Sequence, residues 1–153
     1  MEGFYTMKGY ELVRRGLLTA AMEDYLEMIC RMQAGGEGVV RVSALAAALH
    51  VKPSSASKMA GNLREKELIS FPRYGYITLT DTGRSVGEYL LRRHELVNRL
   101  LSAVNGTEDE LEECEKIEHF LSPRTVMNIP DFLRKAGGAQ GEEGAREGSP
   151  GQK

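Results

Sequence analysis

The chain has 153 residues, a formal net charge of −2 and an apolar fraction of 41%, which fits one domain or two small ones. No apolar run approaches the roughly 18 residues of a membrane helix, and the N-terminus lacks the apolar stretch of a secretory signal. The two cysteines, Cys30 and Cys114, provide neither a disulfide framework nor a CxxC zinc motif. These features exclude a membrane-spanning protein and predict a cytoplasmic one.

Charge is distributed unevenly along the chain. Residues 41–84 contain seven basic and three acidic residues, a net charge of +4. Residues 107–153 contain six basic and eleven acidic residues, a net charge of −5. A basic middle followed by an acidic C-terminal part predicts separate roles along the chain, and the basic part allows a nucleic-acid partner despite the negative total.

Three helices are predicted in the N-terminal half. Apolar residues recur at helical spacing from Thr19 to Met32, with Thr19 as the N-cap, and QAGGEG ends that helix. Ser43 is a possible N-cap for a short helix over Ala44–Leu49. After the turn HVK, Pro53 takes the first position of the helix PSSASKMAGNLREKEL, where its missing N–H is harmless. Two helices joined by such a short turn are typical of a helix-turn-helix.

The hydrophobic period then changes from helix to strand and back. Residues Ile69 to Leu79 are strand formers around RYG and predict a β-hairpin, the wing of a winged helix. The long helix DTGRSVGEYLLRRHELVNRLLSAVN follows and ends at Asn105-Gly106. Thr107 and Glu110 have the spacing of a capping box for the next helix. SPRTVMNIPDFLRKA predicts one or two short helices, with Pro130 opening the second.

The two ends of the chain differ in composition. Residues 137–153 are rich in Gly and Glu and contain no apolar residue larger than alanine, so we predict a disordered tail. Residues 1–19 contain aromatic and aliphatic side chains, and we predict a helix packed on the body of the protein. An arm that contacts DNA or a partner subunit is the alternative.

Carboxylates and imidazoles recur at helical spacing. In ECEKIEHFLS, Glu115, Glu118 and His119 stand at i, i+3 and i+4, so an α-helix places them on one face. Three more candidates are Asp24 and Glu27, at i and i+3 on the first helix, and His94 on the long helix. If these elements pack together, the four carboxylates need cations to stay ionised, and two divalent ions balance their charge. Mostly oxygen donors with two nitrogens suit Mn²⁺ or Fe²⁺ better than a thiolate-rich zinc site does.

These motifs, in this order, resemble the diphtheria-toxin-repressor family of metal-dependent transcription regulators, most closely its manganese transport regulator branch. The resemblance runs from about Ala20 to Leu133, and the motifs that carry it are MEDYLEMI, VKPSSASKM, LTDTG, RRHEL and EKIEHFLS. The iron-sensing branch usually has Met in place of Asp24 and Cys in place of Glu115, so both positions carry the manganese-type residue. Asn98 replaces a carboxylate ligand of a second, separate site of the iron-sensing branch.

The resemblance implies a mainly α fold with a small β-wing. It implies an N-terminal extension (1–19), a winged helix-turn-helix DNA-binding domain (20–82), a helical metal-binding and dimerisation domain (83–136) and the tail (137–153). It further implies two Mn²⁺ per subunit, with Fe²⁺ or another divalent metal possible, and a homodimer on a double-stranded DNA operator. The implied metal ligands are Asp24, Glu27, His94, Glu115, Glu118 and His119. We therefore predict a manganese-responsive regulator, a repressor of metal-uptake genes, in which metal between the two domains fixes the dimer for operator binding.

The polar side of the second helix of the helix-turn-helix predicts the DNA contacts. Short hydroxyl and amide side chains and a lysine gather there, and such groups can reach phosphates and base edges. Two residues at the wing tip can reach a phosphate or a minor groove. The candidate DNA-binding residues are Ser54, Ser55, Ser57, Lys58, Asn62, Arg73 and Tyr74.

Three other interpretations stay open. The first is a related regulator that senses Fe²⁺ or Zn²⁺ through the same ligands. The second is a di-metal enzyme, which we do not favour, because Glu115-x-x-Glu118 is neither a Glu-x-x-His pair nor part of a His-x-x-Glu-His motif. The third is a metal-independent winged-helix protein that uses the acidic face for a partner. Cys30 and Cys114 are predicted to pack as small buried residues, with Cys114 pointing away from the ligands.

Overall fold

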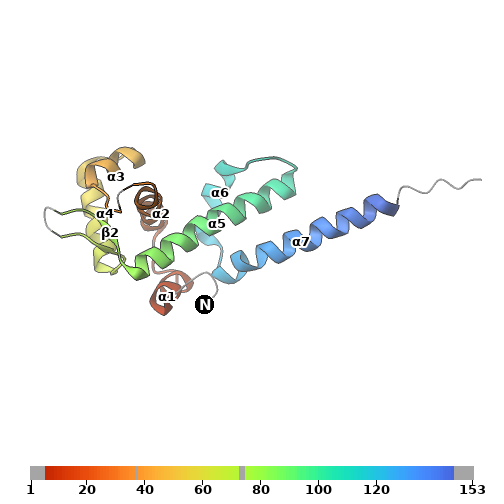
Figure 1. The fold of residues 1–153 in the computed structure, drawn as a ribbon, viewed down its shortest axis with the longest axis horizontal. Coiled ribbons are helices and arrows are strands. Elements are labelled where there is room, and N and C mark those ends of the chain that lie inside the picture. Colours follow the sequence, from red (N-terminus) through yellow and green to blue (C-terminus); the bar gives the residue numbers. More distant parts are fainter. Residues whose placement is uncertain (1–5, 37, 73–74, 147–153) are drawn as a thin grey trace, which may run out of the picture. The chain divides into compact units, whose positions relative to one another are not determined.

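The computed structural model describes residues 6–36, 38–72 and 75–146. The chain divides into two compact units, Met1–Arg93 (unit 1) and His94–Lys153 (unit 2), and each is described by itself. In the described residues, helices predominate and one small antiparallel sheet is present (Figure 1). This agrees with the predicted mainly α fold with a β-wing. None of the helices described is long and apolar enough to cross a membrane.

Unit 1 begins with a helix inside the predicted extension. Helix α1 (Met7–Arg14) is capped by Thr6, whose hydroxyl accepts a hydrogen bond from the Gly9 amide at 3.1 Å. Leu12 is buried, and Gly9 lies so close to Val86 that an added Cβ would stand 3.0 Å from its Cγ2. The predicted helix packed on the body is therefore present.

Helix α2 (Ala20–Gly35) carries much of the core of unit 1. Its amphipathic pattern and its cap were predicted correctly, since the Thr19 hydroxyl accepts a hydrogen bond from the Met22 amide at 3.1 Å. Leu26 and Ile29 are fully buried. Because one face of α2 is apolar, the helix forms the base on which the next two helices pack.

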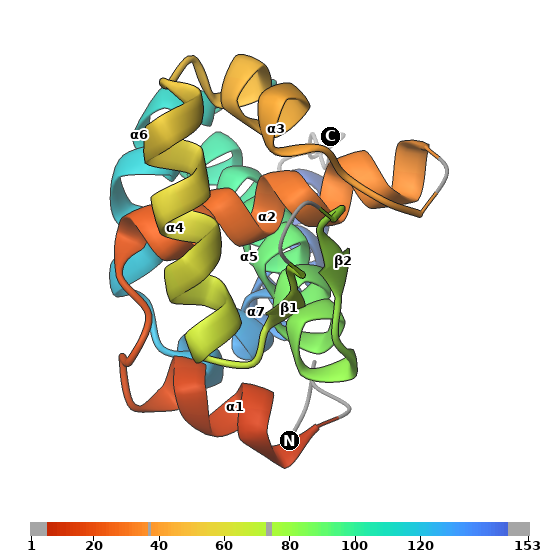
Figure 2. The same cartoon turned by 90° about the vertical axis from the view of Figure 1, so that its left-hand side faces the viewer.

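Helices α3 (Val42–Leu49) and α4 (Pro53–Glu65) form the predicted helix-turn-helix, which Figure 2 shows with α4 in front of α2. His50, with φ 56°, ends α3 in a left-handed turn, and Pro53 opens α4 as predicted. The prediction of Ser43 as N-cap was wrong. Helix α3 starts two residues earlier, because the backbone of Val40 pairs with Ile77 and leaves Arg41 extended at the cap position.

The wing is a hairpin of β1 (Ile69–Ser70) and β2 (Thr78–Leu79), with Ile69 opposite Leu79. It was predicted, but its anchors were not. The guanidinium of Arg64 on α4 donates to the carbonyl of Phe71 at 2.9 Å, and Gln33 on α2 accepts from the Leu79 amide at 3.1 Å. The hairpin is therefore tied to two helices of unit 1.

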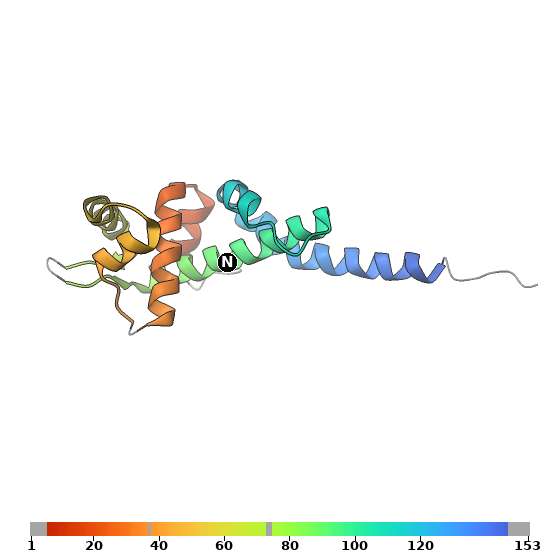
Figure 3. The ribbon, with the colours of Figure 1, turned by 90° about the horizontal axis from the view of Figure 1, so that it is seen from above.

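Helix α5 (Asp81–Asn105) follows the predicted span and ends before Gly106, which has φ +67°. Figure 3 shows α6 (Leu111–Ile117) beside the C-terminal half of α5 in unit 2. The predicted capping box of Thr107 and Glu110 is absent. Glu110 lies before the helix because its amide donates to the Asn98 side chain at 2.7 Å, and the Thr107 hydroxyl donates to the Glu110 carboxylate instead.

After α6 the chain tightens into the 3₁₀ helix η1 (Glu118–Phe120), and α7 (Pro123–Arg146) follows. Pro130 does not open a second helix but lies inside α7. Pro130 cannot donate to the Val126 carbonyl one turn earlier, and burial of Val126 and Ile129 in that turn supports the helix in place of the missing hydrogen bond. Residues 137–153 were predicted to form a disordered tail, and the structure continues α7 through the first ten of them, to Arg146. Residues 147–153 lie outside the described part.

Candidate metal centre and nucleic-acid interface

The six predicted metal ligands divide between the two units. Asp24 and Glu27 lie on α2 in unit 1. The other four belong to unit 2 and come from three elements, α5, α6 and η1. In unit 1, Asp24 is exposed, whereas Glu27 is buried and accepts a hydrogen bond from Arg31 Nη2 at 2.7 Å. A cation at Glu27 would therefore have to share its carboxylate with Arg31.

In unit 2 an imidazole and a carboxylate stand together. His94 Nδ1 lies 2.9 Å from Glu118 Oε2, and the Glu118 side chain is 2% exposed. A ring nitrogen and a carboxylate oxygen can each donate a lone pair to a metal ion, so the two groups can serve one cation together. This pair is the best-defined part of the candidate metal centre.

Three features of unit 2 position the pair. The Asn98 amide group donates to Asp109 at 2.9 Å and its oxygen accepts from the Glu110 amide, which ties the start of α6 to α5. The change from α6 to η1 at Glu118 then turns the chain more tightly than an α-helix would. Asn98 therefore has a structural role at the position where the iron-sensing branch carries a ligand.

The same change of helix type corrects the prediction of a single ligand face. Glu115 lies on α6 and is exposed, Glu118 is buried, and His119 is partly buried on η1. The three residues therefore do not share one face of a continuous α-helix. The sequence pattern could not reveal this, because a 3₁₀ turn and an α turn have similar residue preferences.

The direction of the Cys114 side chain was predicted incorrectly. It is buried as predicted, but its Sγ points toward the candidate centre and lies 3.5 Å from Glu118 Oε2. Cys114 and Glu118 are four residues apart, a spacing that places them on one side of the chain. The four-residue spacing between Cys114 and Glu118 was the sequence signal that could have placed the thiol near the candidate centre.

The donor chemistry of unit 2 fits a divalent cation. One nitrogen of His94, one oxygen of Glu118 and the Cys114 sulfur all lie within 4.8 Å of one another. Imidazole and carboxylate donors suit Mn²⁺, Fe²⁺ and Zn²⁺ alike, so these two groups alone do not select among the three.

Unit 1 contains a buried ion pair that the sequence did not reveal. Arg93 Nη1 donates to Glu23 Oε2 at 2.9 Å, and the two side chains are 1% and 7% exposed. Nearby, burial raises the pKa of Tyr89 far above its usual range. The pair joins α5 to α2 one residue before Asp24 and thus fixes the part of α2 that carries the first two candidate ligands.

The polar side of α4 presents a nucleic-acid-binding face. Ala56, Ala60 and Leu63 are fully buried, so the opposite side of the helix is turned outward. The N-cap residue of α4, Lys52, makes no side-chain hydrogen bond to the first turn. The first-turn amides of this helix are therefore available for a phosphate. The five predicted DNA contacts on this helix are all exposed: Ser54, Ser55, Ser57, Lys58 and Asn62.

Two further candidate DNA contacts, one in the wing and one at the start of α3, were missed by sequence reasoning. Arg73 and Tyr74 lie outside the described residues. The guanidinium of Arg41, the N-cap residue of α3, stacks over the ring of Tyr76, 5.3 Å from its centroid, and both side chains are exposed. A stacked guanidinium is held in place without losing its charge, and such a group suits a phosphate or a minor groove.

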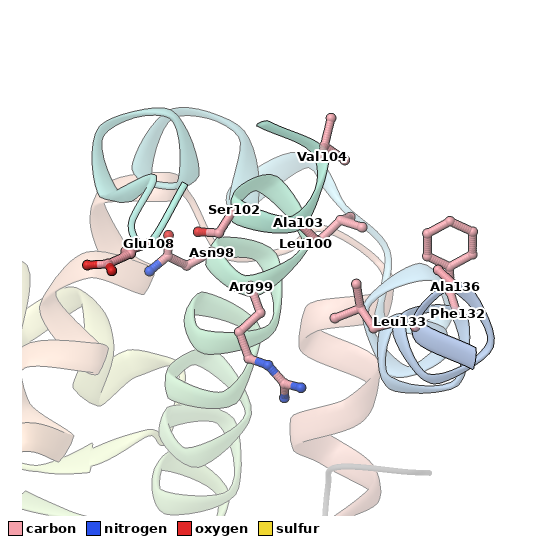
Figure 4. Close-up of a pocket in the computed structure, with 11 residues that line it drawn as sticks. Asn98, Arg99, Leu100, Ser102, Ala103, Val104, Glu108, Phe132, Leu133 and Ala136 are labelled. Atoms are coloured by element: carbon pink, nitrogen blue, oxygen red, sulfur yellow. The ribbon is translucent and has the colours of Figure 1, made fainter. Parts of the chain in front are cut away.

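Unit 2 also has an apolar groove between α5 and α7, with a volume of about 490 Å³. Figure 4 shows Leu133 extending from α7 toward α5, with Leu100 opposite. Val104 and Phe132, at 71% and 60% exposure, lie along the groove. Exposed apolar surface of this kind marks interaction sites in proteins.

A winged helix with an exposed polar recognition face and a separate unit with metal-ligand chemistry together indicate a metal-responsive DNA-binding regulator. Comparison with known proteins agrees with this class. Residues 17–76 match the N-terminal DNA-binding domain of iron-dependent repressors, and residues 80–137 match their metal-binding and dimerisation domain. The chain belongs to the iron-dependent repressor family, which is the diphtheria-toxin-repressor family identified from its motifs.

Relatives in this family include regulators named for manganese. The chain is 36% identical over 116 residues to the HTH-type transcriptional regulator MntR of Oceanobacillus iheyensis, covering 75% of this chain and 78% of that protein. It is 36% identical over 119 residues to MntR of Bacillus subtilis, covering 77% and 83%.

Two solved structures show the same fold. A manganese-dependent transcriptional repressor in complex with manganese has a TM-score of 0.65 and 32% identity, covering 73% of this chain and 52% of that one. ScaR with bound Zn²⁺ has a TM-score of 0.60 and 28% identity, covering 74% and 53%. The chain spans about half the length of these two structures.

Proposed function

We propose that this protein is a manganese-responsive, DNA-binding transcriptional repressor that acts as a homodimer in the cytoplasm, where it controls metal-uptake genes. The observation that carries the proposal is the His94–Glu118 pair, 2.9 Å apart, in the unit that matches a metal-binding and dimerisation domain. The exposed polar face of α4, in the unit that matches a DNA-binding domain, supports it.

The six predicted ligands act together in this proposal, with two Mn²⁺ bound per subunit. Without metal, four carboxylates repel one another, and unit 1 is free to move with respect to unit 2. Coordination neutralises that charge and links Asp24 and Glu27 of unit 1 to the four ligands of unit 2. The two recognition helices of a dimer are then held at a separation that matches half-sites one helical turn apart. Metal thus favours the DNA-competent arrangement by population shift.

The apolar groove of unit 2 is the proposed dimer surface. The apolar side chains of Phe132 and Val104 are largely exposed along the groove, as at surfaces that bind another protein. The domain model that matches this unit is one of metal binding and dimerisation. Light scattering should give the mass of a dimer for the protein and of a monomer for Phe132→Glu. A dimeric Phe132→Glu variant would place the interface elsewhere.

The function is tested on DNA duplexes enriched from a random pool by the Mn²⁺-loaded protein. Fluorescence anisotropy should show specific binding with Mn²⁺ and its loss with a chelator. His119→Ala should stay folded and lose the response to Mn²⁺. Glu95→Ala, an exposed neighbour of His94 on α5, is the matched control and should respond normally. Equal affinity with Mn²⁺ and with chelator would contradict the proposal.

A further inference from the structure

The Cys114 side chain sits inside the metal-ligand group of unit 2 instead of in the apolar core. Its Sγ lies 3.8 Å from His94 Nδ1 and 3.5 Å from Glu118 Oε2. The thiol is also within 3.4 Å of the His94 carbonyl, to which it donates. Cys114 is fully buried and Glu118 nearly so, and the polar neighbours of the sulfur are His94 and Glu118.

The three donors already form a triangle of the right size for one ion. Tetrahedral coordination with a metal–sulfur length of about 2.3 Å and other lengths of about 2.1 Å separates sulfur from either partner by about 3.6 Å, and nitrogen from oxygen by about 3.4 Å. The corresponding separations here are 3.8, 3.5 and 2.9 Å. Shifts of about half an ångström or less, within reach of side-chain rotation, therefore complete the site.

We propose that Cys114 is a metal ligand, and that with His94 and Glu118 it forms a nitrogen–sulfur–oxygen site for thiophilic divalent cations, Zn²⁺ or Co²⁺. The inference rests on the proposed function, because it shares two of the ligands assigned there. On binding, the thiol proton leaves to solvent and a sulfur–metal bond forms, with no change in oxidation state.

A sulfur donor changes which metals the protein distinguishes. Thiolate ligands favour Zn²⁺ and Co²⁺ over Mn²⁺, which prefers carboxylate and water. Since His94 and Glu118 serve both kinds of metal, Zn²⁺ or Co²⁺ competes with Mn²⁺ for this part of the centre. The protein therefore responds to the ratio of these metals and not to manganese alone.

The experiment uses Co²⁺, whose sulfur-to-metal charge-transfer band in the near ultraviolet reports thiolate coordination directly. The chain has only two cysteines, so Cys30→Ser leaves Cys114 as the sole possible source of the band. Cys30 lies on α2 in unit 1, outside the proposed site, and burial raises the pKa of its thiol. Its replacement by Ser should therefore leave metal binding in unit 2 unchanged. The full chain carrying Cys30→Ser should show the band and reach saturation with Co²⁺.

The variants Cys114→Ser and Cys114→Ala should lose the band. Zn²⁺ affinity should fall about 10-fold or more in both, the size expected when a metal site loses a supporting group, whereas Mn²⁺ affinity changes much less. If Co²⁺ binds with visible ligand-field bands but without a charge-transfer band, Cys114 is not a ligand, and the proposed function stands. If neither Mn²⁺ nor Co²⁺ binds, both proposals fail together.

Discussion

At the scale of single residues, replacing one member of the buried Glu23–Arg93 ion pair should strongly destabilise the fold. Both side chains are almost fully buried, 2.9 Å apart. Arg93→Ala would remove the guanidinium from the buried Glu23 carboxylate, and breaking a buried ion pair in this way destabilises a protein by about 3–5 kcal/mol. Urea unfolding should show this loss, whereas Arg92→Ala, its exposed neighbour, should change the free energy of unfolding by less than about 0.5 kcal/mol.

A double variant separates the ion pair from simple packing. Glu23→Met with Arg93→Met removes both charges and keeps much of the volume, so it should recover most of the stability lost in Arg93→Ala. If the double variant is as unstable as the single one, the pair contributes through shape and not through charge compensation.

Lys58 on α4 should contribute mainly its positive charge to DNA binding, through the phosphate backbone. It is exposed on the same side as Ser54 and Asn62, four residues to either side. Lys58→Ala should weaken binding to all sequences alike and lower the slope of log affinity against log salt by about one unit. The measurement is anisotropy over a salt series with Mn²⁺ present. An unchanged slope and affinity would mean that α4 is not the helix in the groove.

Residue types indicated which donors could bind a metal, but not how the structure arranges them. The pairing of His94 with Glu118 follows the predicted set, but Cys114 was expected to point away from it. Periodicity assumes 100° per residue, and the 3₁₀ turn at Glu118 breaks that assumption just where the ligands lie. The Glu23–Arg93 pair was equally hidden, since 70 residues of sequence separate its members.

At the scale of elements, the junction between wing and α5 depends on one glycine. The Gly83 amide donates to the Thr80 hydroxyl at 3.0 Å, and a Cβ added to Gly83 would overlap the carbonyl oxygen of Leu68. Gly83→Ala should therefore lower the free energy of unfolding by about 3 kcal/mol or more, since backbone must move to make room. Thermal unfolding followed by circular dichroism measures the effect.

Gly61 provides the matched control in a helix interior. Nothing lies within 4 Å of a Cβ added there, in the middle of α4. Gly61→Ala should therefore raise stability by about 0.5–1 kcal/mol, because alanine has the higher helix propensity and restricts the unfolded chain. Opposite signs for the two substitutions would confirm that close contact, not helix propensity, determines the choice of glycine at position 83.

Element types were predictable where local signals and packing agree. Thr19 caps the start of α2, Pro53 opens α4, and Gly106 follows the end of α5, as these residue types predict. Boundaries failed where a distant group intervened. Val40 pairs with Ile77 and moves the start of α3, and Asn98 binds the Glu110 amide and delays α6. A proline inside α7 was misread for the same reason, because the burial that supports it is not local.

At the scale of the whole molecule, the proposed function makes metal and DNA binding interdependent, because its candidate ligands come from both units. Asp24 and Glu27 belong to the unit that carries α4, and the other four candidate ligands belong to unit 2. In the proposed function, a metal bound by both sets would restrict the movement of the DNA-binding unit. Mn²⁺ should therefore raise specific DNA affinity by about 5- to 150-fold, the usual range of an allosteric coupling.

Linkage then requires the reverse effect, and this is the strictest prediction. The enriched duplex should raise Mn²⁺ affinity by the same factor by which Mn²⁺ raises DNA affinity, because both describe one coupling free energy. Calorimetric titration of Mn²⁺ into the protein, with and without duplex, gives the first factor, and anisotropy gives the second. A duplex of scrambled sequence is the control and should leave Mn²⁺ affinity nearly unchanged. If specific DNA leaves Mn²⁺ affinity unaltered while Mn²⁺ still promotes DNA binding, the metal acts by neutralising charge near the phosphates and not by restricting the two units.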